Sequence, residues 1–269
     1  MDFKRQFSRF SSKLVLVLMF LMLSLSASCK TEEEKKLESL FADGKFPFTN
    51  ILGEAPEIAD FILQNKQAFL ADLNYVLQNN TEDLFILADK AHFLDKDFKP
   101  SDVLPLEKND SYVFYRNDLS LRTPAEKSLR VMGEGAKQDG ITLVVSSTFR
   151  SYDYQKMIYE RNVKQMGQAA ADRESARPGT SQHQLGTAVD FGSITDEFAE
   201  TKAGKWLDVN AMKYGWSLSF PKGYEPVTGY RWECWHYRYI GVHACAFQQK
   251  WFKNVQQYMM EFIYNWQQF

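Results

Sequence analysis

The chain has 269 residues, of which 45% are hydrophobic and 25% are charged, and its formal net charge is −2. This composition is typical of a globular protein, and the lack of a basic excess argues against nucleic acid as a partner. Removal of an N-terminal export segment would leave roughly 240 residues, enough for one sizeable core domain.

The N-terminus has the pattern of a targeting segment. Basic side chains come first, and an almost unbroken apolar run follows from Leu14 to Leu25. This run is too short for a comfortable membrane span but suits a signal peptide, so residues 1–28 are predicted to be one. Small residues lead into Cys29, as at the processing site of a bacterial lipoprotein, although Ser26 stands where Leu is usual.

We therefore expect an exported protein, periplasmic or on the outer cell surface, that is lipidated at Cys29 and anchored to a membrane. Ordinary secretion and a retained anchor are the alternatives. The other two cysteines, Cys234 and Cys245, either pair in an oxidising compartment or stay as free buried thiols. The sequence leaves both states open.

Two segments precede the main domain. Residues 29–54 begin with a charged run and are predicted to be a solvated tether. Residues 55–80 are predicted to be a helical preface with one helix from Ala55 to Gln78, since Pro56 suits a first helical turn. Apolar residues recur in this helix at near-helical spacing: Ile58, Phe61, Ile62, Phe69, Leu73, Val76 and Leu77.

Residues 81–269 mix helices with separated short strands, which predicts an α+β fold. Thr123 and Glu126 indicate a capping box at the start of a helix that ends at Gly140. Runs of β-branched or aromatic residues predict the strands. The expected strands are 141–149, 186–191 and 232–240, the expected later helices are 152–166 and 244–269, and a loop is expected at 167–180.

The most informative stretch is Ser-Gln-His-Gln-Leu-Gly-Thr-Ala-Val-Asp, residues 181–190. Its second half alternates as a strand does, which places Asp190 on the small-residue face with Ala188. Gly186 permits a tight turn that could bring His183 back toward Asp190. This pair predicts either two zinc ligands or a His–Asp hydrogen bond in a structural turn.

A second stretch, Trp-Glu-Cys-Trp-His-Tyr-Arg-Tyr at 232–239, offers another imidazole and another carboxylate. In a straight strand Glu233 and His236 would face opposite sides, so a common site requires a bulge or turn between them. His183, Asp190 and His236 would give three ligands and leave a fourth zinc position for water. Glu233 could then take a proton from that water and pass it to a leaving amine.

Together these motifs resemble those of the VanY-type D-alanyl-D-alanine carboxypeptidases, in the pattern Ser-x-His-x-x-Gly-x-Ala-x-Asp followed by Glu-x-Trp-His. Residues 147–155, 177–181 and 87–106, the last including 99–102, are similar to further family segments, and the likeness spans roughly residues 85–243. The resemblance implies a hedgehog/D-Ala-D-Ala metallopeptidase-like fold, with a small antiparallel sheet and flanking helices. It makes residues 81–269 a zinc carboxypeptidase domain that includes the C-terminal helix.

The resemblance also implies a role for each matching residue and a peptidoglycan stem peptide as the substrate. Two departures stand beside the motifs: Phe149 replaces the usual Tyr, and Cys234 sits where Pro is common. Neither removes a metal ligand or the base. The implied roles are His183, Asp190 and His236 on one zinc ion, Glu233 as catalytic base, Arg150 at the oxyanion, Gln155 and Ser181 at the substrate carboxylate, and Trp235 as pocket wall.

The leading hypothesis is therefore a zinc-dependent carboxypeptidase that removes the C-terminal residue of peptidoglycan stem peptides. An L,D-carboxypeptidase or an endopeptidase could use the same ligands, because pocket shape sets specificity. An inactive lipid-anchored wall-binding protein is a rival from another class, but the presence of Glu233 and Arg150 argues against it. A structural lipoprotein without metal is the third rival.

Overall fold

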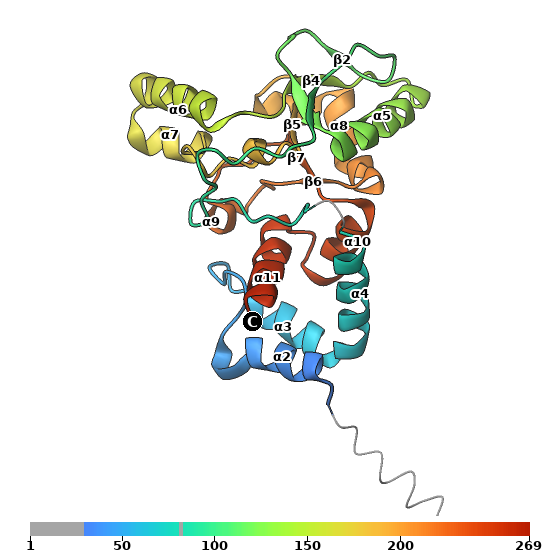
Figure 1. The fold of residues 1–269 in the computed structure, drawn as a ribbon, viewed down its shortest axis with the longest axis vertical. Helices are drawn as coiled ribbons and strands as arrows, with labels where there is room; N and C mark the ends of the chain where they lie inside the picture. The colour runs from blue at the N-terminus through green and yellow to red at the C-terminus, as the bar shows by residue number, and fades with distance from the viewer. Residues whose placement is uncertain (1–29, 81–82) are drawn as a thin grey trace, which may run out of the picture. The chain divides into compact units, whose positions relative to one another are not determined.

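The structure, a computed structural model, describes residues 30–80 and 83–269 (Figure 1). The predicted signal peptide and the predicted lipidation site Cys29 lie outside the described residues. The chain divides after Ser39 into two compact units. Within the described ranges, no helix is both long enough and apolar enough to cross a membrane.

The shorter unit carries most of helix α2 (Glu32–Leu40), which lies in the segment predicted as a tether. A capping box starts this helix. Thr31 Oγ1 accepts a hydrogen bond from Glu34 N at 3.1 Å, and the Glu34 carboxylate accepts one from Thr31 N at 2.9 Å. Three glutamates in the first turn favour the helix further, because their charge complements the helix dipole. The charged run therefore forms a capped helix.

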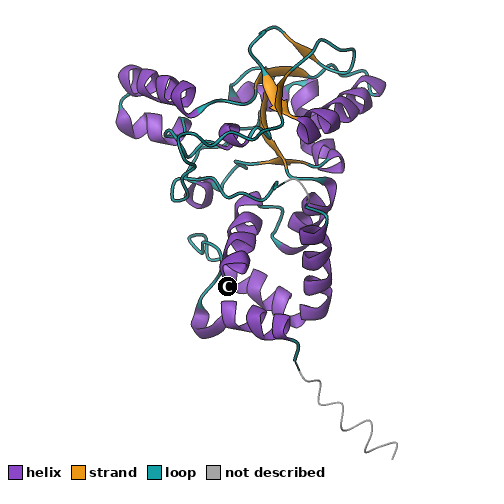
Figure 2. Cartoon of the chain, in the orientation of Figure 1, coloured by secondary structure: helices purple, strands orange, loops and turns teal. Residues whose placement is uncertain are grey.

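The longer unit is built around a five-stranded sheet in the order β2-β4-β5-β7-β6. The β2–β4 pair is parallel, and the remaining pairs are antiparallel. Figure 2 shows these strands gathered in one small sheet with helices around it, which confirms the predicted α+β class. The sheet strands are β2 (Val113–Phe114), β4 (Val144–Ser147), β5 (Ala188–Phe191), β6 (Trp216–Leu218) and β7 (His236–Tyr239). A separate antiparallel ribbon joins β1 (Val103–Pro105) to β3 (Ser120–Arg122).

The hydrophobic core lies on one face of β5. Val189 and Phe191 are fully buried there, and Phe191 packs edge-on against Trp216 and Tyr237. The side chain of Asp190 lies on the opposite face of the sheet, and Asp190 pairs in register with His236 of β7. The period-2 alternation expected for this strand is therefore confirmed, and it separates the core from the polar face.

Helix α5 (Thr123–Gln138) begins where the sequence predicts but is not capped as predicted. The N-cap residue is Arg122, with no side-chain cap. The Glu126 carboxylate instead accepts hydrogen bonds from Tyr112 and Arg130. The capping-box prediction was wrong because Tyr112, from outside the helix, and Arg130, one helical turn later, hold this carboxylate. Gly140 has φ 73° just beyond the helix, as expected for a C-terminal glycine.

Helix α6 (Tyr152–Met166) has the predicted bounds, and the Ser151 side chain caps it by accepting from Tyr154 N. The predicted loop at 167–180 was wrong in part, since it contains α7 (Gln168–Glu174), which packs against α6. Short polar helices of this kind have no apolar stripe for a sequence pattern to find. The remaining helical pieces are α8 (Lys202–Asn210), α9 (Glu225–Thr228), η1 (Ala42–Gly44), η2 (Gln182–Leu185), η3 (Asp196–Glu200) and η4 (Ala211–Tyr214).

The predicted preface helix and the predicted last helix are each two helices. The first pair is α3 (Ala55–Gln64) and α4 (Lys66–Gln78), with a break at Asn65. The second pair is α10 (Val242–Trp251) and α11 (Gln256–Gln268), separated by residues 253 and 254 with positive φ. Neither break contains Pro or Gly, so a composition-based reading has no signal for it.

These four helices form one aromatic cluster. Phe69 of α4 is fully buried and packs within 5.1–5.4 Å, between ring centroids, of Phe247, Trp251 and Phe262. Aromatic pairs at such distances add attraction beyond their buried area. The preface and the C-terminal helices therefore pack on each other within the unit of residues 40–269.

Candidate metal centre and its cavity

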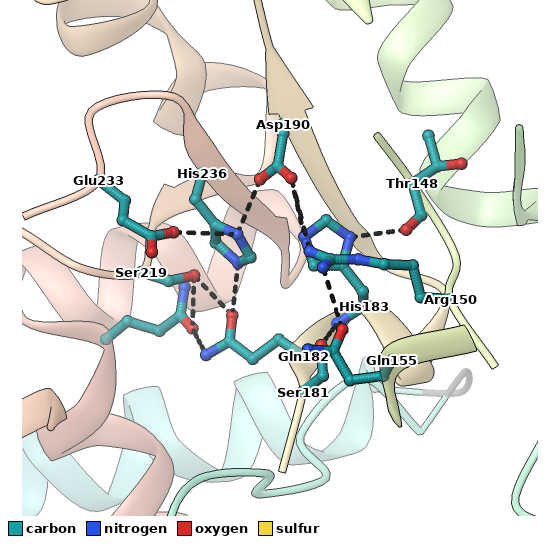
Figure 3. A network of polar contacts seen from close by, with 11 residues as sticks. Thr148, Arg150, Gln155, Ser181, Gln182, His183, Asp190, Ser219, Glu233 and His236 are labelled. Carbon is teal, nitrogen blue, oxygen red and sulfur yellow. Dashed lines mark hydrogen bonds and ion pairs between the residues drawn. The ribbon is translucent and has the colours of Figure 1, made fainter. Parts of the chain in front are cut away.

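Two imidazoles and one carboxylate converge on the polar face of the sheet (Figure 3). Asp190 lies on β5 and His236 opposite it on β7, with His236 Nδ1 3.0 Å from Asp190 Oδ1. His183 comes from η2, and its Nε2 lies 3.2 Å from Asp190 Oδ2. Gly186 adopts φ 70° at the end of η2, which makes the predicted tight turn. The predicted convergence is confirmed, with ligand atoms within 4.8 Å of one another.

The hydrogen bonds of His183 show which nitrogen can bind a metal. Its Nδ1 lies 2.6 Å from the carbonyl oxygen of Thr148, which can only accept, so Nδ1 carries the proton. Its Nε2 then carries no proton and has a free lone pair. This nitrogen is buried and has no hydrogen-bond partner among the described residues. This pattern, one nitrogen held by a carbonyl and the other presented inward, is the usual arrangement of a metal-binding histidine.

The charges of the cluster suit a cation. Burial and the Arg150 guanidinium lower the pKa of His183 to about 4, which keeps the imidazole neutral at physiological pH. Burial opposes ionisation of Asp190, but contacts with His183 and His236 hold its pKa well below the usual range. A buried carboxylate is costly unless a positive charge compensates it, and a cation held between Asp190 and the two imidazoles would do so. Two imidazoles and one carboxylate are a donor set that fits zinc and leaves a position open.

Glu233 reaches the same face because the chain turns before β7. His236 N donates to Glu233 O at 3.1 Å, which closes the turn, and Glu233 Oε2 lies 3.7 Å from His236 Nδ1. The predicted need for a turn or bulge is confirmed. Burial and the charge of Asp190 raise the pKa of Glu233 to about 8. A cation in the cluster would favour its ionised form.

Arg150 lies at the edge of the cluster, just after β4. Its backbone N donates to His183 O at 3.2 Å, and its Nη2 lies 3.6 Å from Asp190 Oδ2. Its Nη1 donates to Gln155 Oε1 at 3.0 Å, while Nε is buried without an acceptor among the described residues. The guanidinium is thus fixed by the protein and retains a donor for another group.

The two residues predicted at the substrate carboxylate occupy different places. Ser181 lines the cavity in front of the cluster, and its Oγ accepts from His183 N at 3.3 Å. Among the residues that the structure describes, those lining this cavity do not include Gln155. It supports Arg150 on one side and donates to Ala176 O at 2.7 Å on the other. Its direct contact with a substrate stays a prediction.

The cavity has a volume of about 330 Å³, which is enough for the end of a short peptide. Trp235 forms part of its wall, as predicted, and Arg231 lies over the Trp235 ring at 5.8 Å. Sequence patterns did not single out several polar residues of the wall, because they lie in α6, α7 and the connections. These residues are Arg116, Tyr154, Arg161, Asn162, Glu174 and Arg231.

The thiols stand apart from this chemistry. Cys234 and Cys245 are both buried and free, which decides between the two states that the sequence left open. Cys234 Sγ points toward the carbonyl oxygens of Thr195 and Asp196, at 3.6 and 3.8 Å. Burial raises the pKa of the Cys234 thiol, so the thiolate needed for nucleophilic chemistry is disfavoured.

Comparison with known proteins agrees with this geometry. The family described as "VanY: D-alanyl-D-alanine carboxypeptidase" matches residues 118–242. YodJ of Bacillus subtilis, which carries the name of a carboxypeptidase, is 32% identical over 224 residues, covering 80% of this chain and 79% of that protein. A D-alanyl-D-alanine carboxypeptidase of Enterococcus faecium is 27% identical over 222 residues, covering 79% of this chain and 69% of that protein.

Two solved structures show the same fold. The LdcB LD-carboxypeptidase aligns with a TM-score of 0.60 at 32% identity, covering 70% of this chain and 88% of that one. A VanY D,D-pentapeptidase variant in complex with Zn(II) aligns with a TM-score of 0.54 at 25% identity, covering 67% of this chain and 98% of that one. The similarity therefore extends over most of both neighbours.

Proposed function

The chain belongs to the VanY family of D-alanyl-D-alanine carboxypeptidases, and we propose that it uses one zinc ion to remove the C-terminal D-alanine from peptidoglycan stem peptides. One observation carries the proposal: His183, Asp190 and His236 present their donor atoms to one point, with Glu233 Oε2 3.7 Å from His236 Nδ1. This is the ligand count of a catalytic zinc site, with a base beside its open position.

The zinc ion, when bound, supplies the Lewis acidity that makes water a nucleophile at neutral pH. Glu233 accepts the proton of the attacking water and returns it to the amine nitrogen of the departing D-alanine. Arg150 donates hydrogen bonds to the carbonyl oxygen as negative charge develops there. Because Gln155 and the His183 carbonyl already hold Arg150, this donor needs little reorganisation.

The cavity holds the end of the peptide. Ser181 Oγ accepts from a backbone N–H, so its own proton is available for the terminal carboxylate of the substrate. Trp235 and Phe220 give the cavity apolar walls beside the polar cluster. Gln155 contributes through Arg150, and its second amide proton is available if the carboxylate approaches it.

A second candidate has a specific observation behind it, since the structural neighbour LdcB at 32% identity is an LD-carboxypeptidase. Synthetic stem pentapeptides ending in D-Ala-D-Ala and tetrapeptides ending in a single D-Ala distinguish the two activities by product mass. Release of D-alanine from the pentapeptide alone supports the first proposal, and release from the tetrapeptide alone supports L,D-carboxypeptidase action. Cleavage inside the stem would indicate an endopeptidase, and wall binding without hydrolysis of any peptide would indicate an inactive binding protein.

We also propose that the protein is exported and held at a membrane by a lipid on Cys29. The support is the basic start, the apolar run and the small residues that precede this cysteine. Cys29→Ser should move the protein from the membrane fraction to the soluble exported fraction and abolish labelling with a fatty acid analogue. A Cys29→Ser variant that stays in the membrane fraction would show that the N-terminal segment is a retained anchor.

A further inference from the structure

A chain of buried hydrogen bonds runs from the metal cluster to the C-terminal helix α11. His236 Nε2 lies 3.2 Å from Gln182 Oε1, and Gln182 Nε2 lies 3.3 Å from Gln256 Oε1. Gln256 Nε2 in turn lies 3.4 Å from the carbonyl oxygen of Ser217. His236, Gln182 and Gln256 are 3%, 7% and 1% exposed, so bulk water cannot readily replace these contacts.

We propose that Gln256 is a positioning residue that orients Gln182 and so holds His236 with its proton on Nε2, which leaves Nδ1 for the metal. The inference rests on the proposed function only in that the cluster binds a metal. Gln256 opens helix α11 and lies outside the 118–242 segment that matches the family. A part of the chain that the family match does not cover would therefore act on the metal centre.

The direction of these hydrogen bonds follows from which atoms can donate and which can only accept. The Ser217 carbonyl oxygen can only accept, so Gln256 must turn its NH₂ group toward it. The Gln256 carbonyl oxygen then faces Gln182 and requires a donor, which is the Gln182 NH₂ group. The Gln182 carbonyl oxygen is left facing His236 Nε2, which must donate. One backbone carbonyl thus fixes the orientation of two side-chain amides and one imidazole.

The neighbouring hydroxyl cannot replace Gln256 in this role. Ser219 Oγ lies 2.7 Å from Gln182 Oε1 and 3.3 Å from Gln256 Oε1. A hydroxyl both donates and accepts, so it would satisfy the Gln182 amide in either orientation. Only the amide of Gln256, anchored by Ser217, distinguishes the two orientations of Gln182.

The orientation matters because Asp190 competes for the imidazole proton. Asp190 Oδ1 lies 3.0 Å from His236 Nδ1 and favours a proton there, where it blocks the metal-binding lone pair. The Gln182 carbonyl favours the proton on Nε2 instead. Outer partners of metal-bound histidines typically change metal affinity by about 10–100-fold. Loss of the oriented amide should therefore weaken zinc binding while the three ligands stay in place.

The test compares two buried glutamines that differ in their link to the metal cluster. Gln256→Met removes the orienting amide at similar volume. Gln248→Met is the matched control, because Gln248 is also 1% exposed and is hydrogen-bonded to Ser217 Oγ and Asn254, whereas its hydrogen bonds within the described part of the chain do not include Gln182. We expect Gln256→Met to raise the zinc dissociation constant by about tenfold or more in a chelator competition. Gln248→Met should lower the melting temperature similarly and change zinc affinity less than about twofold.

A rescue variant and a spectroscopic measurement complete the test. A carboxylate at position 182 accepts in either orientation, so Gln182→Glu combined with Gln256→Met should restore zinc affinity. In the zinc-loaded protein, NMR should show His236 bound through Nδ1 with a slowly exchanging Nε2 proton, and Gln256→Met should make that proton exchange faster. Equal zinc affinity in the two Met variants would overturn the proposal.

The wild-type spectrum keeps the proposal testable if Gln256→Met does not fold. Coordination of zinc through Nε2 of His236, with the proton on Nδ1, would refute it. These measurements need no substrate, so a protein that binds zinc as described but does not hydrolyse D-Ala-D-Ala peptides would contradict the proposed function and leave the inference standing.

Discussion

Replacing Glu233 with glutamine is the sharpest test of the proposed chemistry, because it separates metal binding from proton transfer. Glu233 Oε2 lies 3.7 Å from His236 Nδ1, while the three proposed ligands are in closer mutual contact around Asp190. Glutamine keeps the volume of glutamate but cannot accept a proton at neutral pH. Glu233→Gln should therefore bind zinc as the wild type does and lose most of its turnover.

The expected loss follows from the role of one proton acceptor. A positioned general base contributes about 10²–10⁴-fold to the rate, which corresponds to about 3–5 kcal/mol of activation free energy. The Arg150 donor and the ligand cluster remain in the variant, so a residual rate above that of free zinc is expected. kcat should fall by this factor while KM changes little, because Glu233 touches neither end of the bound peptide in the proposed mode.

The assay measures D-alanine release from a synthetic pentapeptide together with zinc content of the same sample. Asp190→Asn is the control, and it should lose both zinc and activity, since it removes the charged ligand between the two imidazoles. Glu233→Gln that loses zinc as Asp190→Asn does would show that Glu233 is a ligand. Glu233→Gln with full zinc and undiminished kcat would refute its role as base.

Three further outcomes test the fold around the site. In the metal-free protein, the pKa of Glu233 is raised from 4.5 to about 8, so the folded state binds the Glu233 proton more tightly than the unfolded state does. The protonated Glu233 therefore contributes its full stabilisation below pH 4.5, and this stabilisation is lost as the pH rises through about 8. Chemical denaturation with chelator present should show that Glu233→Gln reduces this loss of stability between pH 5 and about 9, and parallel curves for variant and wild type would contradict the burial argument. Gly186→Ala should destabilise the protein by about 1–2 kcal/mol and weaken zinc binding, because a Cβ at φ 70° would lie 2.9 Å from side-chain atoms of Arg122 and Val103 at the turn that carries His183; an unchanged zinc affinity would show that the turn does not set the ligand position. Phe69→Ala should cost about 3–5 kcal/mol by opening the aromatic helical cluster while leaving zinc affinity unchanged in the folded fraction, as measured by denaturation and by chelator competition.

Local rules were enough to predict the metal cluster because each of its parts is encoded nearby in the chain. Strand alternation placed Asp190 on the face opposite Val189, and Gly186 supplied the turn that returns His183. The strand period also predicted the turn between Glu233 and His236, since a straight strand would separate them. These inferences needed only a few residues on either side of each motif.

Two other features of the fold were not predicted correctly from local sequence patterns. The expected capping box at Thr123 failed because Tyr112 and Arg130 take the Glu126 carboxylate. The break between α10 and α11 occurs at Lys253 and Asn254, where no Pro or Gly marks it. For Glu126, the outcome is set by competition among the possible partners of its carboxylate, which a capping-box pattern does not include.

The placement of Gln182 shows how the motif and the rest of the fold meet. It stands beside His183 in the chain, yet its side chain binds the other imidazole, His236, and the first residue of α11. A glutamine in this position orients the imidazole only while α11 holds Gln256 against it. Helix α11 is in turn held by the aromatic contacts of Phe262 with Phe69 of α4 and with Phe252, the residue that follows α10. Helices that lie outside the family segment thereby become part of what keeps the metal ligands in their binding state.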